Sequence, residues 1–264
     1  MTYRSRLAAA VESRGGLCVG IDPMPSVLAA WGVQDDVAGL ERVSRGIVEG
    51  LGEHAAVFKP QSAFFEPFGA AGIAVLERVL DDIGQAGALS ILDVKRGDIG
   101  SSMDGYARAY LTDGAPLAAD AITVNPYLGV GTLESTFALA KAEGRGVYVL
   151  ARTSNPGGAA IQGAVVDGVS VAQHVLDELT VLNASHDDLI GVVLGATHDD
   201  LGCDPSHFNG SILAPGIGVQ GASMSDLERI FAKVLPNVLP NASRFVIGSG
   251  PEELFSRFNE LLGR

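Results

Sequence analysis

Three charged side chains lie close together in the segment ILDVKRGDIG, residues 91–100: Asp93, Lys95 and Asp98. They follow an apolar run that is typical of a buried strand. Asp93 and Lys95 are two residues apart, so in a strand their side chains leave the same face. Lys59, at the end of the apolar segment AAVFKP, adds a second ammonium group. Charged groups at the ends of two such segments form a candidate catalytic array.

The alternating charges suit a decarboxylation. A substrate carboxylate held about 4 Å from Asp93 is repelled by roughly 4 kcal/mol at an effective dielectric constant of 20, and this repulsion ends when CO2 leaves. Lysines already held by aspartates stabilise the carbanion, and Lys95 is placed to protonate it. The structural alternative is an ion-pair network that only closes one end of the fold, or a solvated rim. Desolvation of such charges costs several kcal/mol per ion, so apolar residues would serve stability better.

Eight apolar segments bounded by turn residues are predicted to be strands: 17–22, 55–60, 88–95, 120–126, 146–153, 189–196, 211–216 and 244–249. Amphipathic helical spacing separates them, as at Ile73, Leu76, Leu80 and Ile83 and at Val169, Ala172, Leu176 and Leu179. The strands are continuously apolar, as expected when helices cover both faces. The pattern predicts an α/β fold in which residues 1–264 form one (β/α)8 TIM barrel. An open doubly wound sheet is the structural alternative.

A barrel places its functional groups where the strands end. The residues expected at this rim include Asp22, Lys59, Asp93, Lys95, Asp98, Thr123, Ser154, Gln220, Gly248 and Ser249. Glycine-rich segments follow the last two expected strands, at 214–223 and 247–253. Loops at these two positions commonly bind phosphate through backbone N–H groups and the N-terminus of a helix. The sequence therefore predicts a phosphorylated small molecule as the substrate.

Composition narrows the function classes. The net charge of −13 disfavours binding to nucleic acids or anionic membranes, and no basic stripe offsets it. The chain has no apolar run of about eighteen residues and no signal-peptide pattern at its start, so we expect a cytoplasmic protein. Cys18 and Cys203 do not form a disulfide framework, which fits a reducing compartment.

Together these segments resemble the orotidine 5'-phosphate decarboxylase family, and its mycobacterial-type subfamily in particular. The segments that carry the resemblance are LCVGIDP, VFKPQSAFFEPFGAAGIAVLERV, LDVKRGDIGSSM, PLAADAITVNPYLGVGTL, GVYVLARTSNPGG and PGIGVQGA. They span nearly the whole chain. The resemblance implies decarboxylation of orotidine 5'-phosphate to uridine 5'-phosphate and CO2, the last step of UMP biosynthesis, without a cofactor or a metal.

The resemblance also implies roles for individual residues. Lys59, Asp93, Lys95 and Asp98 are the expected catalytic residues, and the expected substrate-binding residues are Asp22, Ser102, Thr123, Ser154, Gln220, Gly248 and Ser249. Asp93 would face the orotate carboxylate, and Lys95 would deliver the proton to C6. Asp22 and Lys59 would bind ribose hydroxyls, Ser154 the pyrimidine and Gln220 the phosphate.

Asp98 and Ser102 would reach the active site of a partner subunit, which implies a homodimer with shared sites. Ser102 stands where the family usually has a threonine, and it keeps the hydroxyl group.

One departure from the family pattern concerns the phosphate. The family places an arginine just after the last strand, whereas the aligned stretch here is read as Ile247-Gly248-Ser249-Gly250. Arg244 would begin the expected strand at 244–249, roughly 13 Å away toward the other end of the barrel. Phosphate binding is then expected to rest on backbone N–H groups, Ser249, Gln220 or an arginine from elsewhere.

Four alternative functions are weighed against this interpretation. A sugar-phosphate aldolase or decarboxylase of the same superfamily needs carboxylates for Mg²⁺, and Lys59 stands where an acid would be expected. A Schiff-base aldolase needs a neutral lysine, whereas Lys95 between two aspartates is expected to stay charged. His198, Cys203 and His207 have a spacing that could suit zinc, but in a polar, loop-like segment. A non-catalytic nucleotide-binding barrel is favoured only by the missing arginine.

Overall fold

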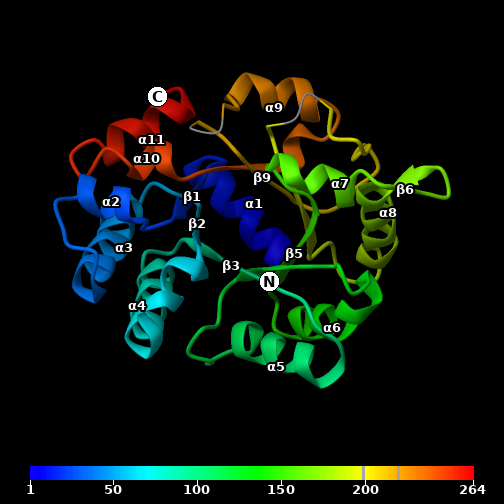
Figure 1. Cartoon of the computed structure of the whole chain (residues 1–264), viewed down its shortest axis with the longest axis horizontal. Coiled ribbons are helices and arrows are strands. Elements are labelled where there is room, and N and C mark those ends of the chain that lie inside the picture. Colours follow the sequence, from blue (N-terminus) through cyan, green and yellow to red (C-terminus); the bar gives the residue numbers. More distant parts are fainter. Residues whose placement is uncertain (198–199, 219–220) are drawn as a thin grey trace.

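The computed structural model describes residues 1–197, 200–218 and 221–264. The strands are β1 (Cys18–Ile21), β2 (Val57–Pro60), β3 (Leu89–Arg96), β4 (Ala121–Val124), β5 (Gly146–Arg152), β6 (Val165–Val166), β7 (Val169–Ser170), β8 (Ile190–Leu194), β9 (Ile212–Pro215) and β10 (Val238–Ala242). The helices are α1 (Tyr3–Arg14), α2 (Pro25–Ala30), α3 (Val37–Leu51), α4 (Gly69–Gln85), α5 (Gly100–Leu111), α6 (Glu134–Ala142), α7 (Ala159–Gln162), α8 (Val171–Asn183), α9 (Met224–Phe231), α10 (Arg244–Ile247) and α11 (Leu254–Leu262). Figure 1 shows the helices arranged around a central ring of strands.

Among the described residues, eight strands close into a parallel barrel in the order β1-β10-β9-β8-β5-β4-β3-β2. The strands β6 and β7 form a separate antiparallel hairpin. The predicted (β/α)8 barrel is therefore confirmed, and closure rules out the open doubly wound sheet. A closed parallel barrel has no free strand edge, and its carboxyl ends all meet at one rim.

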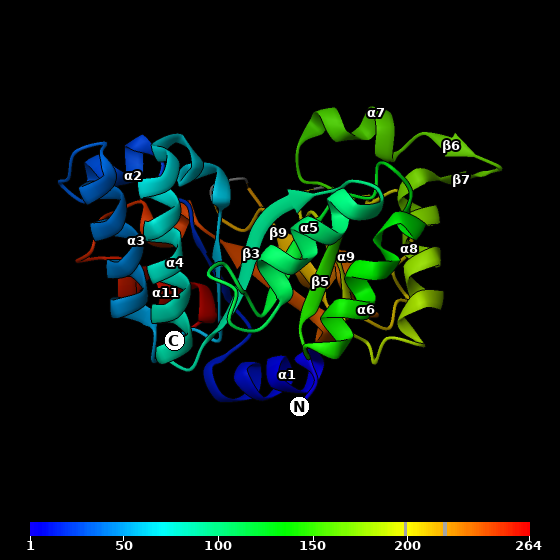
Figure 2. The ribbon, with the colours of Figure 1, turned by 90° about the horizontal axis from the view of Figure 1, so that it is seen from below.

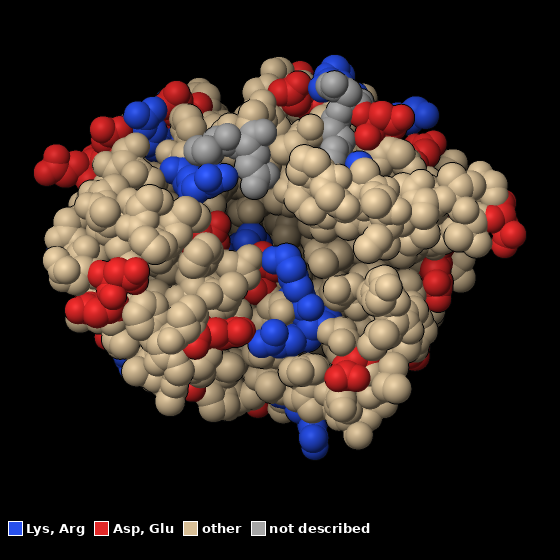
Figure 3. All heavy atoms as spheres, in the orientation of Figure 1, with Lys and Arg blue, Asp and Glu red and all other residues tan. Residues whose placement is uncertain are grey.

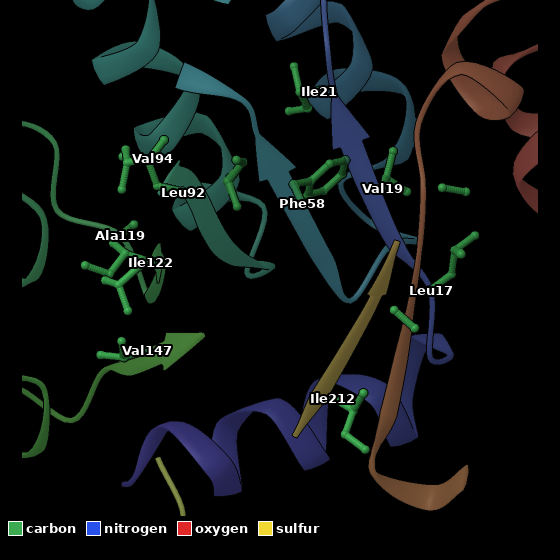
Figure 4. Close-up of a cluster of buried hydrophobic side chains, with 14 of the residues drawn as sticks. Leu17, Val19, Ile21, Phe58, Leu92, Val94, Ala119, Ile122, Val147 and Ile212 are labelled. Carbon is green, nitrogen blue, oxygen red and sulfur yellow. The ribbon is translucent and has the colours of Figure 1, made fainter. Parts of the chain in front are cut away.

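Two apolar clusters hold the barrel together, one on each side of the strands. Outward side chains such as Val19, Phe58 and Leu92 are fully buried beneath the helices, and Figure 4 shows them within this layer. The second cluster takes residues from all eight barrel strands, including Cys18 and Leu213, and fills the interior. Burial on both faces explains why the strand sequences are continuously apolar rather than alternating.

Helix α1 closes the end of the barrel where the strands begin, as Figure 2 shows below the strands. The Tyr3 ring meets the Tyr148 ring edge-on at a centroid distance of 6.2 Å, and the two hydroxyl groups lie 3.0 Å apart. Tyr148 in turn donates to the Ser211 hydroxyl at 3.1 Å. With α1 as a floor, the opposite rim is left open for a site.

The prediction of a strand at 244–249 is wrong. The last barrel strand is β10, which pairs Leu239 with Leu213 of β9, and residues Arg244–Ile247 form the short helix α10. Pro240 and Asn241 have low strand propensity, so local sequence disfavours the true strand. The β-branched residues Val246 and Ile247 are also buried, but in the outer cluster between strands and helices. Val169 also differs from its expected helix, because it lies in β7.

Candidate active site

A cavity of about 390 Å³ opens at the carboxyl ends of the barrel strands. Strands β1 to β4 supply a polar wall, made by Asp22, Lys59, Gln61, Asp93, Lys95 and Thr123. Leu150, Val193 and Leu213 supply apolar surface from the opposite strands. Figure 3 shows this hollow in the centre of the face, with basic and acidic side chains inside and at its margin.

The Asp93 carboxylate is the centre of the polar wall. Its Oδ2 accepts hydrogen bonds from Lys59 Nζ and Gln61 Nε2, each at 2.9 Å. Its Oδ1 accepts from Lys95 Nζ at 2.6 Å and from the Thr123 hydroxyl at 2.7 Å. Only 6% of Asp93 is exposed, so the carboxylate has exchanged its water for four protein donors.

The charges of this cluster are held by one another. Burial raises the pKa of Asp93, but Lys59 and then Lys95 outweigh it and keep that pKa well below its usual range. Burial lowers the pKa of Lys59, but Asp93 and then Asp22 outweigh it and raise that pKa above its usual value. Lys59 and Asp93 are therefore a buried ion pair at neutral pH.

Lys95 has an unusual backbone conformation. Its φ of 46° lies in the left-handed region, which non-glycine residues rarely adopt. The pairing of β3 with β4 shifts register between Leu92 and Arg96, and the Lys95 N–H donates to the Thr123 hydroxyl at 3.0 Å. The irregularity places the Lys95 ammonium beside Asp93 while 44% of its side chain stays exposed to the cavity. Strained backbone of this kind concentrates at functional sites.

Asp22 and Ser154 line the cavity as the sequence predicts. One carboxylate oxygen of Asp22, Oδ1, is buried without a hydrogen-bond partner among the described residues. The backbone of Ser154 lies close to Gly195, and only glycine leaves room there, because a Cβ at position 195 would come within 2.7 Å of the Ser154 backbone. Thr123 also lines the cavity, but its hydroxyl is already engaged by Lys95 N–H and Asp93.

Arg244 lines the same cavity, which corrects the prediction that it lies at the far end of a strand. The strand β10 ends at Ala242, so Arg244 is the first residue of α10 and comes directly after the carboxyl end. The expected departure from the family pattern rested on a strand at 244–249, which the structure does not have. Gly248 and Ser249 follow α10 and do not line the cavity, so they do not occupy the expected strand-end position.

Two further expected site residues, Asp98 and Ser102, lie outside this cavity. The Asp98 carboxylate accepts from the Ile99 N–H at 2.8 Å, and Ser102 is exposed on α5. Neither lines the cavity that holds Asp93. Gln220 lies outside the described residues.

Gln61 and Asn241 line the cavity although neither was among the predicted site residues. Gln61 follows Lys59 by two positions, so the period-two rule for strands could have placed it on the same face. Asn241 lies in β10 with 6% of its surface exposed, and its amide donates to the Cys18 carbonyl at 3.1 Å. It was missed because its strand was misplaced.

The described residues give no support to the metal-dependent alternatives. Strand β2 ends in Lys59-Pro60, so no acid stands where the Mg²⁺-dependent alternative requires one. In the zinc alternative, His198 lies outside the described residues, and burial raises the pKa of Cys203 to about 11. The described part of the chain holds no group of three His, Cys, Asp or Glu side chains arranged for a metal ion, and no helix in it is long and apolar enough to span a membrane.

Comparison with known proteins gives consistent results. Residues 15–254 match the family described as orotidine 5'-phosphate decarboxylase / HUMPS. An orotidine 5'-phosphate decarboxylase of Salinispora arenicola is 54% identical over 254 residues, which cover 95% of this chain and 91% of the relative. That of Streptomyces coelicolor is 52% identical over 253 residues, again 95% and 91% of the two chains. A Streptomyces avermitilis crystal structure with the same assignment has 50% identity and a TM-score of 0.94, covering 98% of this chain and 93% of the other.

Proposed function

The chain belongs to the orotidine 5'-phosphate decarboxylase / HUMPS family, and from this premise we propose that it converts orotidine 5'-phosphate to uridine 5'-phosphate and CO2. This reaction is the last step of UMP biosynthesis. The relatives that bear the decarboxylase name cover almost the whole chain at about half identity. The observation that carries the proposal beyond family membership is the Asp93 carboxylate between two lysines in the cavity.

Asp93 destabilises the bound substrate. Its low pKa keeps it anionic, so a substrate carboxylate placed beside it meets a fixed negative charge. At about 4 Å the repulsion is roughly 4 kcal/mol at an effective dielectric constant of 20. Loss of CO2 removes one of the two anions, and the repulsion is relieved as the carbon–carbon bond breaks. Four donors prevent Asp93 from turning away.

Lys95 supplies the proton that replaces CO2 on C6. Its ammonium group is on the cavity side of Asp93 and is partly exposed, whereas the Lys59 ammonium is buried on the other oxygen. The developing carbanion lies in the field of both ammonium groups, which are in place before the reaction begins. Transfer of the Lys95 proton to C6 leaves a neutral amine that solvent can reprotonate. The proposed reaction requires no redox cofactor.

The remaining wall fits a nucleotide. We assign Asp22 and Lys59 to the ribose hydroxyls, because Asp22 follows β1, Lys59 lies in the neighbouring β2, and both line the cavity. Ser154 is assigned to the pyrimidine. Arg244 is assigned to the phosphate, since guanidinium groups bind phosphate in a bidentate manner. Three cations at one cavity in a chain of net charge −13 favour a substrate that carries a phosphate and a carboxylate.

The proposed enzyme is a homodimer. Asp98 and Ser102 lie outside the cavity of their own chain, which agrees with a role in the partner's site. Ile99, Tyr127 and Leu128, in the neighbouring loops after β3 and β4, expose 61%, 75% and 49% of their surfaces. We propose that they belong to a surface that another subunit covers, since large exposed apolar patches mark interaction sites. We also propose that residues 1–264 form one catalytic domain and that the enzyme acts in the cytoplasm, as its biosynthetic family suggests.

The test of the proposed function is the loss of orotidine 5'-phosphate absorbance with purified protein in excess EDTA. We expect turnover by the wild type and a loss of at least about a thousandfold in a Lys95→Ala variant, because the proton donor is gone. A Lys141→Ala variant removes an exposed lysine that pairs with Asp187 on the surface and serves as the matched control. A folded wild type that leaves the substrate intact would contradict the decarboxylase assignment.

A further inference from the structure

Each oxygen of the Asp93 carboxylate receives one charged donor and one neutral donor. Lys59 and Gln61 share Oδ2, and Lys95 and Thr123 share Oδ1. The two ammonium groups account for the electrostatic stability of the anion. They do not account for its orientation, because an ammonium on a flexible four-carbon chain is a point charge with rotatable donors.

The neutral donors are better anchored than the ammonium groups. Gln61 is bridged to Asp93 between β2 and β3, and its N–H donates to the Ile21 carbonyl of β1 at 3.1 Å. Its backbone is therefore tied to strands on both sides. Its side-chain amide has fewer rotatable bonds than lysine and donates along a fixed plane.

Thr123 is anchored still more tightly. It is 1% exposed and lies in the middle of β4. Its hydroxyl accepts from Lys95 N–H at 3.0 Å and donates to Asp93 Oδ1 at 2.7 Å. The Thr123 hydroxyl thus connects the left-handed backbone of Lys95 to the Asp93 carboxylate. The Lys95 ammonium group contacts the same carboxylate. Because both hydrogen-bonding directions are in use, this hydroxyl has no proton left to donate to a substrate.

We propose that Gln61 and Thr123 are positioning residues that fix the plane of the Asp93 carboxylate, and the backbone of Lys95 behind it, for the reaction of the proposed function. The inference rests on that function. It moves Thr123 from the expected substrate-binding set to a role exerted through Asp93 and Lys95. It adds Gln61, for which the sequence predicted no role.

A positioning role predicts which kinetic constant should change. The substrate's phosphate, ribose and base contact other groups, so loss of Gln61 or Thr123 leaves ground-state binding intact. The repulsion and the proton transfer depend on placement to a fraction of an ångström, and a misplacement of about 1 Å can cost about a hundredfold in rate. The change must therefore appear in kcat rather than in KM or in the affinity for the product.

The experiment compares Gln61→Met, Thr123→Val and Thr123→Ser with the wild type, by kcat and KM for orotidine 5'-phosphate and the Kd of uridine 5'-phosphate. We expect kcat to fall about tenfold to a hundredfold in Gln61→Met and Thr123→Val, with KM and Kd within about threefold. Thr123→Ser keeps the hydroxyl and is expected to restore kcat to within about threefold of the wild type.

Two control variants remove similar hydrogen bonds at residues that do not line the cavity. Gln173→Met removes an amide that donates to the Asp177 carboxylate at 2.7 Å, and Thr180→Val removes a hydroxyl that donates to the Leu176 carbonyl at 2.7 Å. Both lie in α8 and are expected to leave kcat unchanged. Thermal unfolding of every variant shows whether a lost rate reflects a lost fold, and Thr123→Ser keeps the test valid if Thr123→Val fails to fold.

The outcomes separate this inference from the proposed function. Turnover by the wild type with unchanged kcat in Gln61→Met and Thr123→Val would overturn the positioning role alone. A rise in KM and Kd with kcat unchanged would also overturn it, since that pattern belongs to a residue that binds substrate. A wild type without turnover would overturn the function and the inference together.

Discussion

At the scale of single residues, the stability of the site depends on the charge of Asp93. Two lysines share one buried carboxylate, so the loss of that anion leaves unpaired positive charge in the interior. Removing one partner of a buried ion pair typically costs about 3–5 kcal/mol. We expect Asp93→Asn to be destabilised by about this amount at pH 7, as measured by urea unfolding.

The destabilisation of Asp93→Asn should depend on pH in a defined direction. In the wild type the pKa of Lys59 is raised, so its contribution is complete below about pH 10.4 and is lost only as the pH rises through the folded value. In Asp93→Asn we expect burial, the largest of these effects, to outweigh Asp22 and lower the pKa of Lys59, so that the variant gains stability as the pH rises through that lowered value. The difference in unfolding free energy between the variant and the wild type should therefore become smaller between pH 7 and about pH 10. Asp177→Asn is the surface control, and a difference independent of pH would contradict the argument.

At the scale of elements, the short segment from β10 to α10 carries Arg244, which we propose binds the substrate phosphate. Because β10 ends at Ala242, Arg244 stands at the rim rather than at the floor. We expect Arg244→Gln to weaken inhibition by uridine 5'-phosphate about 10- to 150-fold, since a charged hydrogen bond contributes about 1.5–3 kcal/mol. Inhibition by uridine, which has no phosphate, should not change. Arg257→Gln removes a surface arginine paired with Glu253 and should leave both affinities as they are.

The sequence predicted seven of the barrel strands and most of the charged wall, because continuous apolar runs and period-two spacing are local properties. It could not place the last strand. In Val238–Ala242 the burial on both faces of a closed barrel overrides the poor propensity of Pro240 and Asn241. The β-branched segment after Arg244 satisfied strand propensity without being a strand. The hydrogen bonds of Gln61 and Thr123 to Asp93 were also out of reach, since they depend on register between neighbouring strands.

The packing of helix α1 against the barrel can be tested by its effect on stability. A Cβ on Gly146 would lie 2.4 Å from the Tyr3 ring, and that ring is held in place by Tyr148. We expect Gly146→Ala to lose about 1–3 kcal/mol of unfolding free energy through overpacking. Gly84 lies in α4, where an added Cβ would meet nothing within 4 Å, so Gly84→Ala should gain about 0.5 kcal/mol. Equal effects of the two substitutions on the thermal midpoint would contradict this prediction, because they would show that the Tyr3 ring moves aside at no cost.

At the scale of the whole molecule, the proposed dimer determines whether each cavity is complete. Asp98 follows the strand that carries Asp93 and Lys95, yet it lies outside their cavity. If Asp98 completes the partner's site, a chain that lacks Lys95 and a chain that lacks Asp98 can repair each other. In a mixed dimer, both defects fall in one site and the other site is intact.

A mixture of the two defective chains tests the shared site quantitatively. Lys95→Ala and Asp98→Ala should each be nearly inactive, and an equimolar mixture that has exchanged subunits should recover about a quarter of the wild-type specific activity, because random pairing makes half of the dimers mixed and each has one intact site. The control is a mixture of Lys95→Ala with Lys59→Ala. Lys59 and Lys95 contact the same carboxylate of one chain, so every site in that mixture keeps a defect and must stay inactive. No recovery in the first mixture would mean that Asp98 does not act across a subunit interface, and recovery in the control as well would mean that the regained activity has another cause.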